Sequence, residues 1–453
     1  MNNNPVSKRA AADKLMETLR SSGTPDRTET PRRNRPQPIV RRAADFSTLP
    51  EYQALKLQRA TADMLKIDVP FFRQHEGRAA DTTTVAGHKV LNFSTYDYLG
   101  LNGDARIVTA AKQAIDRYGT SVGASRLTAG ERPIYHDLET ALAKFCGTEA
   151  ALSFVSGHAT NVSVIGCLLN SKDVIYADAL AHNSLIEGAK LSGATCLIFP
   201  HNDSDALEAL VRENRSRFRR AMIVVEGLYS MDGDVPDLGR LLAIKRRYDA
   251  WLLVDEAHSD GVLGERGRGI AEEQGIDPGE VEIWMGTLSK AFASTGGYIA
   301  GSQALIDYLK THCPGFVYSV GLPPVMAASA FAALQVIEQE PERIATLRAN
   351  GSLFLQRARA AGLDVGQSIG ASVIPVVVGD TLTTVVLANR LLDQGLYVIP
   401  IIFPAVGEKQ ARLRFFITAR HTAKQIEKAV DLTAQELSRL RKEPPVINGL
   451  AGS

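Results

Sequence analysis

The sequence predicts an α/β fold in which a mainly parallel central sheet is followed by a smaller C-terminal α+β domain. Two observations predict it. Between about residues 101 and 335, short apolar segments alternate with helix-like segments, as in sheets whose strands are buried on both faces. After residue 335 the helices and strands alternate over a shorter stretch of about 110 residues. In parallel sheets of this kind, ligands bind at the carboxyl ends of the strands.

Six segments are predicted to be strands of the central sheet, because each is short and apolar on both faces. They are Ala150–Val155, Asp173–Ala177, Thr195–Phe199, Ala221–Val225, Trp251–Val254 and Val281–Met285. Helical stretches such as Leu238–Tyr248 separate them. The C-terminal part is predicted to contain, in order, a helix at Pro341–Ala361, a strand at Ser372–Val378, a helix at Thr384–Gln394, strands at Tyr397–Ile402 and Ala411–Ile417, and a helix from Thr422.

These patterns divide the chain into five expected parts. Residues 1–50 form an arm rich in proline, arginine and hydroxyl residues, with little to bury, which predicts disorder apart from a short helix formed by Ala12, Leu15, Met16 and Leu19. Residues 51–100 are an N-terminal segment, 101–335 the large domain, 336–440 the small C-terminal domain, and 441–453 a tail.

Composition limits the class of protein without naming its activity. The apolar fraction of 45% and the charged fraction of 22% are those of an ordinary globular protein, and the net charge of +1 argues against a nucleic-acid partner. No run of about 18 apolar residues predicts a membrane span. The start of the chain lacks the apolar core of a secretory signal, and the four cysteines show no CxxC spacing. We therefore expect a cytoplasmic enzyme.

The most informative segment surrounds Lys290. An apolar strand runs into Gly286–Lys290 (GTLSK), and Gly296 and Gly297 follow. A lysine at the end of a buried strand can form a Schiff base with an aldehyde cofactor, while the hydroxyls of Thr287 and Ser289 hold a phosphate. This combination favours a covalently held, phosphorylated cofactor.

Further polar residues follow the other predicted strands. The turn Ser156–Gly157–His158 opens a predicted helix, whose amino end offers free N–H groups to a phosphate. Other strand ends carry His182, Glu226 with Ser230, and Asp255 with His258. A lone histidine or small-residue turn is weak evidence. Polar groups at five strand ends, however, are poorly explained by chance.

Pyridoxal phosphate (PLP) is the cofactor that needs this set of partners. Asp255, when ionised, would keep the pyridine nitrogen protonated, and His258 lies three residues further on, where it can reach the phenolic oxygen. His182 is placed to stack on a planar ring. Lys290 would hold the cofactor and then act as general base at the substrate Cα, provided that burial or a nearby positive charge lowers its pKa. No metal site is predicted.

Five motifs resemble the α-oxoamine synthases, which are fold-type I PLP enzymes. They are Asn92–Leu101 (NFSTYDYLGL), Glu226–Asp234 (EGLYSMDGD), Asp255–His258 (DEAH), Gly286–Lys290 (GTLSK) and Ala411–Arg414 (ARLR). They occur in family order, and the resemblance extends over about residues 50–440. It implies a reaction in which an amino acid condenses with an acyl thioester and loses CO2, leaving an α-amino ketone.

The resemblance also implies roles for individual residues. Lys290 corresponds to the Schiff-base lysine, Asp255 to the pyridinium partner, and Arg414 to the group that binds the substrate carboxylate, a task suited to the planar fork of arginine. The implied cofactor-binding residues are Ser156, Gly157, His158, His182, Glu226, Ser230, Asp255, His258, Thr287, Ser289 and Lys290. Family active sites lie between two subunits, so a homodimer with shared sites is expected.

Departures from the family concern the substrates. Tyr96 matches serine palmitoyltransferase rather than 8-amino-7-oxononanoate synthase. The apolar stretch Ile401–Pro404 lacks an arginine that serine palmitoyltransferase carries, and the surrounding sequence resembles synthase domains of polyketide or carrier-protein pathways. We expect glycine, alanine or serine as the amino acid and a medium or long acyl group on CoA or a carrier protein. A fold-type I aminotransferase or aldolase, which would share Lys290 and Asp255, is the alternative.

Overall fold

The computed structural model describes residues 45–443 of the chain. The chain divides into two compact units, Met1–Thr61 and Ala62–Ser453. The described part of the first unit holds a 3-10 helix, η1 (Phe46–Thr48), and most of α2 (Pro50–Leu65). Residues 1–44 of the predicted arm, with the helix expected near Leu15, and residues 444–453 of the tail lie outside the described residues.

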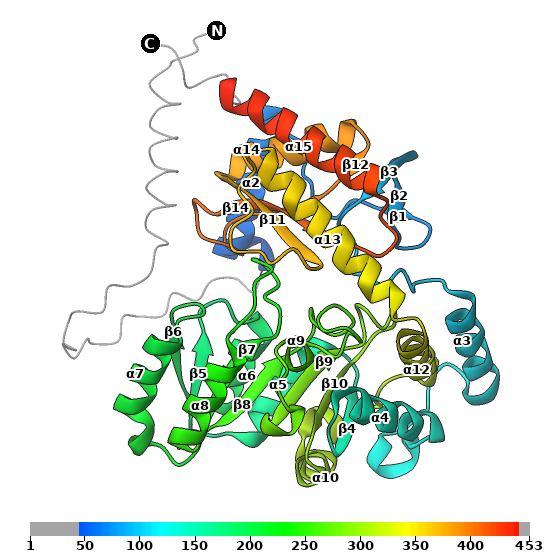
Figure 1. Cartoon of the computed structure of the whole chain (residues 1–453), viewed down its shortest axis with the longest axis vertical. Helices are drawn as coiled ribbons and strands as arrows, with labels where there is room; N and C mark the ends of the chain where they lie inside the picture. Colours follow the sequence, from blue (N-terminus) through cyan, green and yellow to red (C-terminus); the bar gives the residue numbers. More distant parts are fainter. Residues whose placement is uncertain (1–44, 444–453) are drawn as a thin grey trace. The chain divides into compact units, whose positions relative to one another are not determined.

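A seven-stranded, mainly parallel sheet forms the centre of the second unit (Figure 1). Its strands are β4 (Ala150–Phe154), β5 (Val174–Asp178), β6 (Thr195–Phe199), β7 (Ala221–Glu226), β8 (Trp251–Asp255), β9 (Ile283–Thr287) and β10 (Gly297–Gly301), in the order β4-β10-β9-β8-β7-β5-β6. Every pair from β9 to β6 is parallel, and β10 alone runs antiparallel to both of its neighbours. The predicted fold class is confirmed.

Three details of the sheet differ from the sequence prediction. β10 was not predicted, because glycines at both ends and an alanine give Gly297–Gly301 a weak strand pattern. β9 begins at Ile283 rather than Val281. β6 is an edge strand in which only Phe199 is buried and Ile198 is 52% exposed, although its apolar sequence predicts a buried central strand.

Helices cover both faces of this sheet. The side chains of β7 alternate, so that Ile223 and Val225 pack into one buried cluster while Met222 and Val224 pack into another. The first cluster includes side chains of α4 (Pro133–Cys146), α7 (Ser204–Asn214), α8 (Leu238–Tyr248) and α12 (Pro324–Gln339), and α3 (Ala105–Tyr118) packs against α12. The second includes those of α5 (Gly157–Leu168), α6 (Asn183–Ser192), α10 (Gln303–His312) and α11 (Pro314–Val317).

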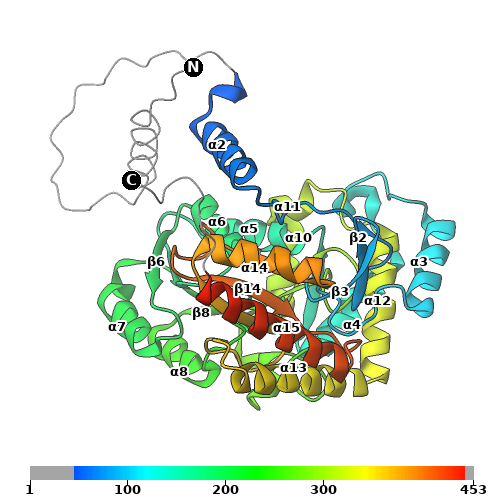
Figure 2. The ribbon, with the colours of Figure 1, turned by 90° about the horizontal axis from the view of Figure 1, so that it is seen from above.

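A three-stranded antiparallel sheet lies in the C-terminal part, in the order β11 (Val373–Gly379), β14 (Ala411–Phe416), β13 (Ile399–Ile401). Figure 2 shows α13 (Glu342–Ala360), α14 (Thr381–Asp393) and α15 (Ala423–Lys442) together with β14. Thr422 caps α15 and exchanges hydrogen bonds with Gln425, which fixes the helix start where the sequence predicts it.

The predicted strand Tyr397–Ile402 is in fact two strands in different sheets. β12 (Leu396–Tyr397) pairs in parallel with β3 (His88–Asn92), whereas β13 pairs with β14. β3 continues the antiparallel sheet of β1 (His75–Glu76) and β2 (Thr82–Val85), which the sequence analysis left undivided. The domain limits given above stay a prediction.

The remaining elements are short. They are the π-helix η2 (Arg126–Gly130), the 3-10 helices η3 (Arg215–Arg217) and η4 (Pro278–Glu280), and α9 (Ile270–Glu273). Over residues 45–443, no helix combines the length and the apolar character that a membrane crossing needs.

Candidate active site

Three predicted site residues lie at the carboxyl ends of adjacent strands. Glu226 ends β7 and is in register with Asp255, which ends β8. Thr287 ends β9, the next strand in the sheet. Because parallel strands end at one edge of the sheet, these side chains gather there without any distortion of the backbone.

The first turn of α5 packs closely against the same edge. A Cβ on Gly157 would lie 3.0 Å from the Thr287 hydroxyl, and one on Gly297 would lie 2.7 Å from the Gly157 Cα. A Cβ at Gly297 would clash with the backbone of Gly157, and one at Gly157 would be in tight contact with Thr287. The contact brings the free N–H groups at the start of α5 next to Thr287.

Hydroxyl groups surround this helix start. Ser156 caps α5, its Oγ accepting from the backbone N–H of Ala159 at 3.1 Å. The Oγ1 of Thr287 lies 3.0 Å from the Oγ of Ser289 and donates to the carbonyl of Gly296. Backbone N–H groups and hydroxyls at a helix amino end form a site for a phosphate.

Lys290 lies three residues after the end of β9 and is half-buried. Its Nζ lies 6.0 Å from the centre of the Tyr96 ring. Burial lowers the pKa of Lys290 to about 8, although the negative charges of Asp255 and Glu226 act in the opposite direction. Near neutral pH an appreciable fraction of the amine is therefore uncharged and nucleophilic.

Asp255 is held by a residue that the sequence analysis missed. The Nδ2 of Asn161, a buried residue of α5, donates to the Oδ2 of Asp255 at 2.7 Å and to the Oγ of Ser184 at 2.9 Å. The backbone N–H of Ala257 donates to the other carboxylate oxygen at 3.0 Å. Both oxygens of the carboxylate are thereby fixed. Asn161 lies four residues after Gly157, on the same face of the helix, and this spacing was the available signal.

His258 is buried beside a tyrosine that was also missed. Its Nδ1 lies 2.7 Å from the hydroxyl of Tyr98, and its ring is parallel to that of Phe416 at 6.3 Å. Burial lowers the pKa of His258, helped by the positive charges of Lys290 and Arg414, so the imidazole is neutral. When Tyr98 donates to Nδ1, the proton of the neutral ring is on Nε2, which can then donate to a further acceptor.

His182 caps α6, and its ring is exposed. Its Nδ1 lies 2.8 Å from the Oγ of Ser184, and its ring centre lies 6.4 Å from that of His158. Since Ser184 also binds Asn161, a chain of hydrogen bonds connects His182 to Asp255. The expected stacking of His182 on a cofactor ring stays a prediction.

Glu226, Ser230 and Arg414 form a second group at this edge. Glu226 Oε2 accepts from the Ser230 N–H at 3.1 Å, and burial raises the pKa of Glu226 to about 8. The Ser230 carbonyl accepts from the guanidinium of Arg414 at 3.0 Å, and this guanidinium lies 4.7 Å from the ring centre of Phe416. Within residues 45–443, the buried Glu226 Oε1 and Arg414 Nε have no hydrogen-bond partner. These two buried groups point to a bound polar molecule.

A cavity of about 460 Å³ reaches Arg414 from outside. Its lining includes Tyr96, Ile399 and Ile401, and otherwise consists of His75, Gly77, Arg78, Ala79, Thr83, Asn92, Ser94, Thr95, Tyr397, Arg414 and Phe416. Only part of the apolar stretch around Ile401–Pro404 lines this cavity: Ile401 does, whereas Ile402 and Phe403 do not. Phe403 is 57% exposed, since it follows the end of β13.

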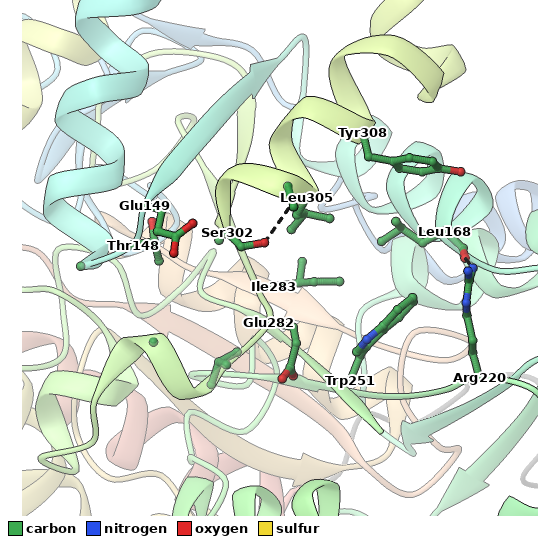
Figure 3. Close-up of a pocket in the computed structure, with 15 residues that line it drawn as sticks. Thr148, Glu149, Leu168, Arg220, Trp251, Glu282, Ile283, Ser302, Leu305 and Tyr308 are labelled. Atoms are coloured by element: carbon green, nitrogen blue, oxygen red, sulfur yellow. Dashed lines mark hydrogen bonds between the residues drawn. The ribbon is translucent and has the colours of Figure 1, made fainter. Parts of the chain in front are cut away.

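A second cavity, of about 510 Å³, lies at the other edge of the large sheet (Figure 3). Trp251 and Ile283, which line it, begin the strands β8 and β9 whose far ends carry Asp255 and Thr287. It contains none of the predicted site residues. Of the predicted site residues, Tyr96 and Arg414 line the first cavity, and the first cavity is therefore the better candidate for substrate binding.

Comparisons with known proteins identify the family of this chain. Residues 88–432 match the model of the family aminotransferase class I and II. The 8-amino-7-oxononanoate synthase of Bacillus pumilus is 36% identical over 396 residues, which cover 87% of this chain and 98% of that protein. The protein of the same name from Beijerinckia indica is 42% identical over 352 residues, covering 78% and 89%. The chain belongs to the α-oxoamine synthase family.

Solved structures of α-oxoamine synthases have the same fold. A serine palmitoyltransferase from S. paucimobilis with bound PLP–myriocin aldimine superimposes with a TM-score of 0.83 at 26% identity, covering 88% of this chain and all of that one. An 8-amino-7-oxononanoate synthase from Francisella tularensis gives a TM-score of 0.68 at 26% identity, covering 78% and 99%. As an α-oxoamine synthase, the chain is a PLP-dependent acyltransferase, and the family predicted from the motifs is confirmed.

Proposed function

We propose that this α-oxoamine synthase condenses glycine, alanine or serine with an acyl thioester, and that the residues described above carry the reaction. The products are an α-amino ketone, CO2 and a free thiol. The observation that supports these roles is that Asp255 ends β8, that Lys290 follows the end of the adjacent β9, and that Arg414 of β14 donates to the Ser230 carbonyl in the loop after β7, the next strand of the sheet.

The residues present fit PLP. The close contact of Gly157 with Thr287 forms a cradle for the phosphate, and the buried, unpartnered Glu226 Oε1 indicates room for a polar ligand beside Asp255. When bound, PLP withdraws electrons from the substrate Cα, which no side chain can do. Lys290 holds the cofactor and moves the proton at Cα. Asp255 would hold a proton on the pyridine nitrogen, and His258 would donate to the phenolic oxygen.

Product analysis tests this function. Glycine, alanine and serine are each supplied with CoA and carrier-protein thioesters, and CO2 and free thiol are measured. We expect equal amounts of CO2 and thiol with one amino acid. Formation of an oxo acid from the amino acid, or of an aldehyde, without thiol release would instead identify an aminotransferase or an aldolase.

Arg414→Ala should weaken amino-acid binding far more than donor binding. A buried guanidinium that binds a carboxylate contributes about 1.5–3 kcal/mol per charged hydrogen bond, so the KM for the amino acid should rise roughly 10- to 150-fold. Arg414→Lys keeps the charge but loses the fork, and an intermediate effect is expected. If the thioester KM rose while the amino-acid KM stayed constant, the role of Arg414 would be wrong.

The cavity beside Arg414 should accept the acyl chain of the donor. Ile399 and Ile401 offer apolar surface there, and each methylene that becomes buried contributes about 0.8 kcal/mol, which corresponds to about a fourfold gain in kcat/KM. We expect Ile401→Asp to reduce the ratio of kcat/KM for decanoyl over acetyl thioester by about tenfold or more. Phe403→Asp, outside the cavity, is the matched control. A carboxylated short chain as the best donor would contradict this proposal.

We also propose that the protein is a cytoplasmic homodimer. Exposed apolar side chains gather next to the large sheet at Leu127, Tyr318 and Val320, which supports an interface between two copies. All four cysteines are free, as is usual in a reducing compartment. Light scattering of the purified holoenzyme gives the subunit number directly.

A further inference from the structure

His201 bridges two carboxylates outside the group of residues assigned above. It follows β6, and its Nδ1 and Nε2 lie 2.8 Å from the Oδ1 of Asp178 and the Oδ2 of Asp234, respectively. Its neighbour Asn202 donates to the same two carboxylates, from its backbone N–H to Asp178 at 2.9 Å and from its side chain to Asp234 at 2.8 Å. Asp178 is the last residue of β5, so the bridge fixes Asp234 to the central sheet.

The bridged imidazole is a cation. Burial opposes the charged form, but the hydrogen bonds and charges of Asp178 and Asp234 outweigh burial and raise the pKa of His201 to about 10. Tyr229, whose ring meets that of His201 edge-on at 4.5 Å, is the third group that faces it. With both nitrogens protonated, each donates to one carboxylate, and such charge-assisted hydrogen bonds are about twice as strong as neutral ones.

Asp234 ends a loop, Gly227–Asp234, that is closed on itself. The N–H of Tyr229 donates to the carbonyl of Asp234, and the N–H of Gly233 donates to the carbonyl of Tyr229, both at 2.9 Å. Because of these internal bonds, we expect the segment between Tyr229 and Asp234 to move as one piece. His201 anchors that piece to the central sheet on one side, and the N–H of Ile369, which donates to the carbonyl of Gly233 at 3.0 Å, anchors it on the other.

This loop supports Arg414. Besides the Ser230 carbonyl, the sulfur of Met231 lies 3.3 Å from the guanidinium of Arg414. On the same strand β14, the guanidinium of Arg412 binds Asp232 at 2.6 Å. The loop thus lies between His201 on the central sheet and the two arginines of β14.

We propose that His201 is a positioning residue, which fixes the loop Gly227–Asp234 through Asp234 and thereby holds Arg414 in the orientation that binds the amino-acid carboxylate. The proposal rests on the role proposed for Arg414. His201 would thus affect the affinity for the amino acid without touching it.

The test compares His201→Ala, Arg414→Ala and the double variant in the holoenzyme. Dissociation constants for the amino acid are obtained by titrating the visible absorbance of the bound cofactor, and KM values for the thioester are measured separately. We expect His201→Ala to raise the amino-acid dissociation constant about tenfold, to change the thioester KM less than about twofold, and to add no further loss when Arg414 is already alanine. His201→Gln, which keeps one donor, should lose less.

A matched control separates positioning from stability. Arg219 lies in the loop before β7. Its guanidinium forms two hydrogen bonds, of 2.8 and 3.0 Å, with the carboxylate of the fully buried Asp173. Arg219→Ala should lower the melting temperature and leave the amino-acid dissociation constant unchanged. If Arg414→Ala weakens amino-acid binding but His201→Ala does not, or if the two losses add, the inference about His201 is overturned. If Arg414→Ala itself has no effect, the proposed role of Arg414 fails instead.

Discussion

Lys290→Ala should abolish covalent attachment of PLP and reduce turnover by about 10²–10⁴-fold or more, because the proposed function makes this one residue both cofactor anchor and general base. Lys290 is only half-buried and lies beyond the end of β9, so the fold should persist. The measurements are the visible absorbance of the purified protein, the mass of the chain after borohydride reduction, and circular dichroism for the fold.

Lys172→Ala is the control for this variant, since Lys172 is exposed in the turn before β5. It should retain the absorbance, the added mass and full turnover. A cofactor mass still attached to another lysine in Lys290→Ala, or an unchanged visible band, would show that Lys290 is not the anchor.

Asp255→Asn should reduce kcat by about 10²–10⁴-fold with little change in cofactor content, because a neutral amide cannot hold the ring proton by charge. The amide also conflicts with its surroundings. Both oxygens of Asp255 accept hydrogen bonds, from Asn161 and from the N–H of Ala257, so an NH2 group must face one of these donors. The measurement is single-turnover loss of the substrate Cα proton.

Asn161→Ala separates these two effects, since it removes one hydrogen bond and leaves the charge of Asp255 in place. It should slow the reaction less than Asp255→Asn does. Near-normal rates in Asp255→Asn would contradict its assignment, and equal losses in both variants would mean that orientation of the carboxylate matters more than its charge.

The sequence predicts those parts of the site that depend on where a strand ends or a helix begins. Glu226, Asp255 and Thr287 end apolar strands, and the ends of neighbouring parallel strands must meet. The caps Ser156 and Thr422 are likewise readable from spacing. The motif resemblance adds the chemistry, and the comparisons confirm the family.

Contacts between distant segments could not be predicted in this way. Asn161 and Asp255 are 94 residues apart, and Tyr98 and His258 are 160 apart, so no local pattern connects them. β10 is a buried strand, but its small residues gave no clear strand pattern in the sequence. Phe403 is apolar, yet it is exposed beyond the end of β13. In each case packing rather than propensity decides the position.

The pairing of β12 with β3 determines when the active site can be assembled during synthesis. Leu396 and Tyr397 are opposite Leu91 and Asn92, and the backbone of Phe93 binds the carbonyl of Tyr397 and the N–H of Phe416. The segment bearing Tyr96 and Tyr98 is therefore anchored by residues that are translated much later than the segment itself. A chain that has not yet reached Phe416 lacks this anchor, however well its central sheet has formed, and closing so long a loop afterwards is entropically costly and slow.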